Sequence, residues 1–84
     1  MSEQEIKSAV SHFILNEFLP GEDPSALTDT TALVSTGILD SIALLKVVTF
    51  LESHFGITLE AHETGVDHLN TIADIVRLVR SKLA

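Results

Sequence analysis

Apolar residues recur at helical spacing in three separate stretches of this chain. In the first stretch, residues 2–18, they share one face of a helix, and they are Ile6, Ala9, Val10, Phe13 and Ile14. Ser2 and Glu5 have the spacing of a capping box, in which each side chain accepts a hydrogen bond from the other residue's backbone. Proline cannot donate the N–H bond that a helix needs, so Pro20 and Gly21 end the pattern. The stretch predicts a helix that ends near Phe18.

The second stretch runs from Ser41 to about His54 or Phe55, and Gly56 is well placed as its C-terminal cap. With 100° of rotation per residue, the expected core stripe is Leu44, Val47, Val48, Leu51 and Phe55. Ile42 and Leu45 fall outside this stripe. Two aliphatic side chains pointing to solvent within one turn of each other can mark a docking patch, although the preceding loop could also fold over them.

The third stretch begins near Thr71, which has the spacing of a capping partner for Asp74. Its expected core stripe is Ile72, Ile75, Val76, Val79 and Leu83. Residues 60–70, which precede it, are mostly polar and predict a loop with one short helical turn at about Val66 to Leu69.

A long connection, residues 20–39, separates the first two predicted helices. Loops of this length in a small domain are usually functional, or are packed by their own apolar residues. The residues that can supply such packing are Leu27, Leu33, Val34, Ile38 and Leu39. Asp23 or Ser25 could open a short helical turn. The layout predicts an all-α, four-helix bundle in a single domain of residues 1–84, with three main helices, one short helix and a long first loop.

Charge and composition exclude several classes of function. The formal net charge is −7, and residues 1–76 carry all twelve acidic residues against only Lys7 and Lys46, a net of 2 − 12 = −10. Such a body repels nucleic acid and attracts basic protein surfaces. No window approaches the ~20 apolar residues of a membrane span, and the N-terminal sequence does not have the layout of a signal peptide. We expect a cytoplasmic monomer that exists as a separate protein.

Neither metal binding nor catalysis is favoured by the sequence. The chain has no cysteine, and His62, Glu63, Asp67 and His68 fall on a predicted loop without a compact ligand spacing. A hydrolase built on Ser41 would need a held imidazole, a cleft and an oxyanion hole, for which the pattern offers no support. We therefore predict a protein that is not itself an enzyme, and keep a small Ser/His hydrolase as an alternative.

The segment between the first loop and the second helix carries the clearest candidate site. Gly37 allows a sharp turn, Ile38 and Leu39 can anchor that turn to the core, and Asp40 precedes the helix start. Ser41 has the residue type of a helix N-cap, whose hydroxyl would accept a bond from a free backbone N–H. This position would hold the hydroxyl of Ser41 at the surface.

The run Gly37-Ile38-Leu39-Asp40-Ser41-Ile42 resembles the Gly-x-x-Asp-Ser-Leu signature of acyl and peptidyl carrier proteins. Residues 27–33, 50–57 and 69–75 resemble other segments of that family at the right spacing, so the resemblance spans essentially the whole chain. It implies that a phosphopantetheinyl transferase attaches 4′-phosphopantetheine from coenzyme A to Ser41. The arm would then hold acyl, aminoacyl or ketide groups as thioesters. Asp40 would contact the transferase or its metal.

Two departures from the family's pattern refine this expectation. Ile42 replaces the usual leucine, and the second helix carries Lys46 with Glu52 as its one acid, whereas carriers of general fatty acid synthesis have an acidic second helix. This points to specialised nonribosomal peptide, aminoacyl or polyketide biosynthesis. A general fatty acid carrier, or a docking module with unmodified Ser41, stays as an alternative.

The expected partners besides the transferase are a loading ligase or acyltransferase and downstream acceptor enzymes. The residues expected to meet these partners are Gly37, Leu39, Ile42, Leu45 and Lys46.

Overall fold

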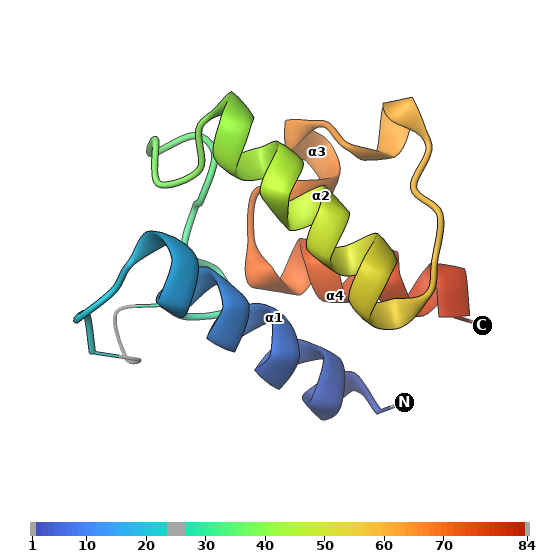
Figure 1. Cartoon of the computed structure of the whole chain (residues 1–84), viewed down its shortest axis with the longest axis horizontal. Helices are drawn as coiled ribbons and strands as arrows, with labels where there is room; N and C mark the ends of the chain where they lie inside the picture. The colour runs from blue at the N-terminus through green and yellow to red at the C-terminus, as the bar shows by residue number, and fades with distance from the viewer. Residues whose placement is uncertain (1, 24–26, 84) are drawn as a thin grey trace.

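The computed structural model describes residues 2–23 and 27–83. Over these residues the chain forms helices and no strands, which confirms the all-α prediction. The elements are α1 (Glu3–Phe18), α2 (Ser41–Phe55), a 3₁₀ turn (Ala61–Glu63), α3 (Val66–Leu69) and α4 (Ile72–Leu83). In Figure 1, α1 and α2 run in opposite directions and α4 lies behind them, with the short α3 leading into it. The 3₁₀ turn was not predicted from the sequence.

Helix α1 begins and ends as the sequence predicts. The Ser2 hydroxyl accepts a hydrogen bond from the Glu5 backbone N–H at 3.2 Å, and the Glu5 carboxylate accepts one from the Ser2 N–H at 3.0 Å. The bond from the Ser2 backbone N–H favours the ionised carboxylate and so lowers the pKa of the Glu5 carboxyl. At the other end, the N–H of the C-cap residue Leu19 bonds to the carbonyl of Leu15. Helix α1 buries Ile6, Val10 and Ile14, and it packs mainly against α4.

Helix α2 spans the predicted residues, but its buried stripe is rotated from the predicted one. Ala43, Val47, Leu51 and Phe55 are buried, whereas Leu44 and Val48 are only partly buried. These four residues lie four apart and form one ridge of the helix, which faces α1 and α4. Ala43 joins the core because its position in the ridge, rather than its size, decides which side it faces.

Helix α4 buries two sides instead of one stripe. Leu78 is 5% exposed although it lies outside the predicted stripe, and Leu83, which we expected in the core, is 42% exposed. The reason is the preceding segment: α3 packs on α4, and Lys82 of α4 forms an ion pair with Glu63 at 2.6 Å. Leu78 lies beside Glu63, Asp67 and His68 of that segment, while Leu83 is the last helical residue and lies at the surface. The predicted cap is confirmed, since the Asp74 N–H bonds to the Thr71 hydroxyl at 3.0 Å.

The first loop is packed by its own apolar residues, as expected. Its buried members are Leu27, Leu33 and Leu39, and Val34 and Ile38 are half-buried against the core. The short turn that Asp23 or Ser25 could open would include residues 24–26, which lie outside the described residues.

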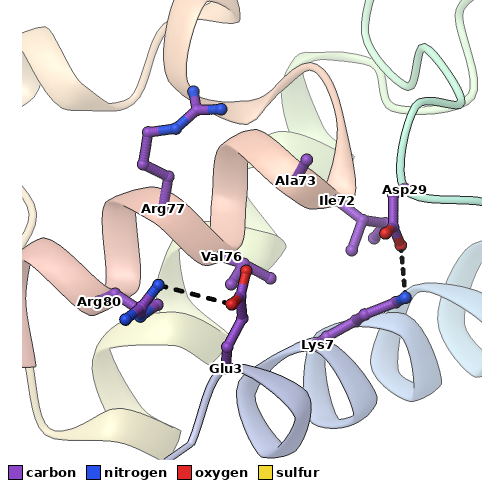
Figure 2. Close-up of a pocket in the computed structure, with 8 residues that line it drawn as sticks. All are labelled: Glu3, Lys7, Asp29, Ile72, Ala73, Val76, Arg77 and Arg80. Carbon is purple, nitrogen blue, oxygen red and sulfur yellow. Dashed lines mark ion pairs between the residues drawn. The ribbon is translucent and has the colours of Figure 1, made fainter.

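An ion-paired cavity of about 200 Å³ lies where this loop meets α1 and α4. Figure 2 shows its two bridges, Lys7 to Asp29 at 2.8 Å and Arg80 to Glu3 at 3.6 Å. The Ala73 N–H also donates to the Asp29 carbonyl at 3.1 Å. Solvent-exposed ion pairs contribute little stability, typically ~1 kcal/mol or less, so the backbone bond and the buried leucines hold the loop.

The chain between α2 and α3 is anchored at both ends. Gly56 caps α2 with a φ of +66°, a conformation that favours glycine. After it, Ile57 and Leu59 are buried, and the Leu59 N–H donates to the Glu52 carboxylate at 2.9 Å. The one acid of α2 is therefore bonded to this segment.

None of the helices that the structure describes has the length and apolar content to span a membrane.

Candidate functional site

A hydrogen-bonded turn, residues 33–39, precedes the start of α2. The Leu39 N–H donates to the Leu33 carbonyl at 2.9 Å, and the Gly37 N–H donates to the Val34 carbonyl at 3.1 Å. Gly37 has a φ of +83°, which residues with a side chain rarely adopt. Leu33 and Leu39 are both buried, so the two ends of the turn are fixed in the core.

Asp40, and not Ser41, is the N-cap of α2. Its backbone is extended, and its carboxylate oxygen Oδ1 accepts a hydrogen bond from the Ala43 N–H at 2.8 Å. An aspartate at this position also offsets the positive end of the helix dipole. Our expectation that Ser41 caps the helix is therefore wrong, because the adjacent carboxylate takes that role. The other Asp40 oxygen, Oδ2, accepts no hydrogen bond within the described residues.

Ser41 is the first helical residue, and its side chain is left free by this arrangement. It is exposed, and its hydroxyl makes no hydrogen bond to any residue that the structure describes. The backbone N–H groups of Ser41 and Ile42 likewise have no acceptor among the described residues, as expected for the first turn of a helix. A phosphate ester on this hydroxyl would lie beside two unpaired donors and the positive end of the dipole. The position thus fits a phosphopantetheine group.

Exposed aliphatic side chains flank Ser41, as the sequence predicts. Ile42 is 70% exposed and Leu45 is 65% exposed. A groove of about 230 Å³ lies between α2 and the approach to α3, and it is lined by Ser41, Leu44, Leu45, Val48 and Thr64. Val66, at the start of α3, is a further exposed aliphatic residue, which the sequence pattern did not single out.

The other expected docking residues divide into two groups. Gly37 and Lys46 are exposed, whereas Leu39 is 1% exposed and packs in the core. A buried side chain cannot contact a partner, so Leu39 is corrected from a docking residue to an anchor of the turn. Lys46 forms no ion pair within the described part of the chain.

A second, larger groove lies between α1 and α2. It has a volume of about 800 Å³ and is lined by Phe13, Glu17, Leu45, Lys46, Thr49, Phe50, Ser53 and His54. The rings of Phe13 and Phe50 stack with centroids 4.1 Å apart, and His54 stacks on Phe50 at 5.0 Å. The sequence signal for this stack was the four-residue spacing of Phe50 and His54, which places them on adjacent turns of one helix.

No hydrogen bond joins any described histidine to Ser41. Ligand atoms of Glu60, His62 and Glu63 lie within 4.8 Å of one another. However, Glu63 is bound to Lys82, and its carboxylate also accepts the Glu60 N–H at 3.0 Å. These contacts explain why the three side chains lie close together: Glu63 joins the 3₁₀ turn to α4.

Comparison with known proteins shows the family to which the chain belongs. Residues 15–79 match the family described as the phosphopantetheine attachment site. The chain is 38% identical over 72 residues to a D-alanyl carrier protein of Streptococcus mutans, which covers 86% of this chain and 87% of that protein. It is 30% identical over 82 residues to an acyl carrier protein of Thermotoga maritima, covering 98% and 96%.

A solved structure extends the likeness to three dimensions. The structure of KstB-PCP in its apo form matches with a TM-score of 0.74 and 30% sequence identity, over 99% of this chain and 91% of that one. The chain therefore belongs to the phosphopantetheine-dependent carrier proteins, the family whose members hold 4′-phosphopantetheine covalently.

Proposed function

We propose that Ser41 is the attachment point of the phosphopantetheine arm, and that the protein carries thioester-bound groups between partner enzymes. The observation that carries this proposal is the exposed Ser41 hydroxyl, which is free of hydrogen bonds at the first turn of α2. When bound, the arm supplies a thiol, which this cysteine-free chain does not have. The chain's own residues hold and present the hydroxyl, and partner enzymes perform the chemistry.

The residues around Ser41 are suited to recognition by a phosphopantetheinyl transferase. Asp40 keeps one carboxylate oxygen unengaged beside the hydroxyl, where the transferase or its metal can reach it. Ile42 and Leu45 offer an apolar surface on the same end of α2, and Gly37 exposes the turn before it. Exposed apolar residues beside a functional group are typical of protein docking sites. The loading ligase or acyltransferase and the acceptor enzymes would use the same surface.

We further propose that the cargo is a small aminoacyl group, in a specialised pathway. Two D-alanyl carrier proteins of streptococci are among the relatives, at 38% and 32% identity. The face of α2 that leads away from Ser41 carries Lys46, and the one acid of this helix, Glu52, is bonded to the Leu59 N–H. The groove beside Ser41 is also small, at about 230 Å³, below the roughly 300–1,000 Å³ of pockets for drug-sized ligands.

A general fatty acid carrier is the second candidate, and one observation favours it. The acyl carrier protein of Thermotoga maritima matches over 98% of this chain, more than the D-alanyl carriers cover. The two candidates share the arm on Ser41 and differ only in the cargo.

Intact mass spectrometry tests both levels of the proposal. After incubation of the apo protein with a phosphopantetheinyl transferase and coenzyme A, we expect one phosphopantetheine mass on the wild type and none on Ser41→Ala. If the wild type gains no mass, or if Ser41→Ala still gains it, the assignment fails. The mass of the protein from its native host then reports the cargo: a small aminoacyl increment supports our proposal, and a long acyl chain overturns it.

A further inference from the structure

Asn70 joins three parts of the chain that meet around the site. It follows α3, and its backbone N–H closes that helix by donating to the Val66 carbonyl at 3.1 Å. Its backbone carbonyl accepts the Leu33 N–H at 2.6 Å. Its side-chain oxygen Oδ1 accepts two further N–H groups, from Val34 at 2.9 Å and from Ser35 at 3.1 Å. One residue thus receives three consecutive backbone donors of the first loop, which lies 35 or more positions away.

These bonds act on the part of the loop that leads to Ser41. The turn that Asn70 holds is closed by the Leu39 N–H, which donates to the Leu33 carbonyl. Asp40, the cap of α2, follows Leu39 directly. Leu33 and Leu39 are both buried, and between them only Val34 and Ile38 pack partly against the core, so the stretch from Val34 to Ile38 also depends on polar bonds for its position. The Asn70 side chain provides the two that tie this stretch to the rest of the fold.

The same residue also ends α3, the helix that follows the groove residue Thr64. Thr64, just before α3, lines the groove beside Ser41, and the exposed Val66 begins α3. Asn70 therefore links the loop on one side of Ser41 to α3 on the other. The bond from the Val34 N–H is part-buried, so loss of its acceptor is costly, whereas the bond from the Ser35 N–H is exposed. Without this side chain the loop would therefore sample other conformations.

We propose that Asn70 is a positioning residue for the modification of Ser41: its Oδ1 holds residues 34 and 35, and thereby the turn that a transferase must recognise together with α3. This inference rests on the proposed function of Ser41. Only the acceptor oxygen is used, because the Asn70 side-chain NH₂ has no partner among the described residues. Aspartate can replace the acceptor, whereas leucine has a similar size and shape without one.

The test compares Asn70→Leu, Asn70→Asp and the wild type as substrates of a phosphopantetheinyl transferase with coenzyme A, followed by intact mass. If the competent loop conformation becomes a smaller fraction of the population, the apparent affinity falls by that fraction. We expect Asn70→Leu to raise KM about fivefold or more with little change in kcat, the size expected when one or two hydrogen bonds are lost. Asn70→Asp should stay within about twofold of the wild type, because both bonds are retained.

A matched control separates positioning from loss of stability. Ser2→Ala removes the cap of α1, far along the chain from the loop, and costs a comparable ~1 kcal/mol of stability. Hydrogen exchange should show faster exchange at the Val34 and Ser35 amides in Asn70→Leu but not in Ser2→Ala. Asn70→Ala provides a second variant without the acceptor, should Asn70→Leu fold poorly.

Three results would overturn the inference while leaving the proposed function intact. They are an unchanged KM in both variants without the acceptor, an equal rise of KM in Ser2→Ala, or no rescue by Asn70→Asp. A wild type that gains no arm at all would instead refute the proposed function, and the inference about Asn70 with it.

Discussion

Leu45 and Leu51 lie on opposite sides of α2 and offer a test that separates docking from stability. Leu45 is 65% exposed beside Ser41, and Leu51 is fully buried in the core. The same substitution, leucine to aspartate, can be made at both positions. We expect Leu51→Asp to unfold the protein, and Leu45→Asp to leave it folded but poorly recognised by partner enzymes.

The magnitudes follow from burial. Complete burial of a leucine stabilises a protein by about 1.5–3 kcal/mol, and Leu45 has only about a third of its surface covered, which gives about 0.5–1 kcal/mol. At Leu51, loss of the side chain alone costs about 2–5 kcal/mol, and an unpaired buried carboxylate costs several more. A domain of 84 residues is stable by roughly 4–13 kcal/mol. Leu51→Asp should therefore remove much or all of the protein's stability.

Thermal unfolding followed by circular dichroism measures the first effect. With a shift of about 4–8 °C per kcal/mol for a domain of this size, Leu45→Asp should lower Tm by less than about 10 °C. Leu51→Asp should show no cooperative transition. If both variants lose stability equally, the outward direction of Leu45 is wrong.

Transfer of the arm measures the second effect. Loss of a central apolar contact typically costs 1–2 kcal/mol, so we expect about a tenfold fall in kcat/KM of the transferase for Leu45→Asp. Ser53→Asp adds the same charge to an exposed position of α2 near its far end, and serves as the control for charge alone. Unchanged transfer by Leu45→Asp, or an equal fall in Ser53→Asp, would show that Leu45 is not a docking contact.

Three further substitutions test the local geometry. Asp40→Asn keeps an oxygen that can cap α2 but removes the charge. The melting temperature should therefore stay within a few degrees of the wild type, while transferase activity falls. A loss of stability as large as the ~1 kcal/mol of a deleted cap would contradict this prediction. Gly37→Ala should lower the free energy of unfolding, measured with denaturant, by about 1 kcal/mol. The cause would be backbone strain alone, because no atom of a residue beyond the chain neighbours lies within 4 Å of the added Cβ. An unchanged free energy of unfolding would mean that the turn relaxes. The Lys82 ammonium lowers the pKa of the Glu63 carboxyl, so this pair stabilises the fold at neutral pH, and its contribution is lost as the pH falls through the lowered pKa. Glu63→Gln should accordingly narrow the stability difference between pH 7 and pH 3, and an unchanged difference would exclude the pair as its source.

Local signals were sufficient to predict most of the helix ends. Ser2 with Glu5 and Thr71 with Asp74 each fix a helix start through a hydrogen bond between residues three positions apart, and Gly56 ends α2 through its left-handed backbone. Such contacts depend on spacing alone, so the sequence contains all the information that they require.

The faces of the helices were less predictable, because they depend on what packs against them. Leu78 is buried beside residues of the segment that includes the unpredicted 3₁₀ turn, and Leu39 lies in the core where its turn closes on Leu33. The cap of α2 shows a different limit. Asp40 and Ser41 are both good caps, and only the backbone geometry decides that Asp40 accepts the bond.

This choice of cap bears directly on function. The hydroxyl of a serine in the N-cap position accepts a hydrogen bond from a backbone N–H of the first helical turn. The hydroxyl of a serine one residue later is free of that bond. Because the Asp40 carboxylate satisfies the Ala43 N–H, the Ser41 hydroxyl can be modified without removing a bond that stabilises α2. We therefore expect apo and modified protein to have the same α2 boundary and nearly the same Tm. A Tm that drops by several degrees on addition of the arm would show that the hydroxyl has a structural role after all.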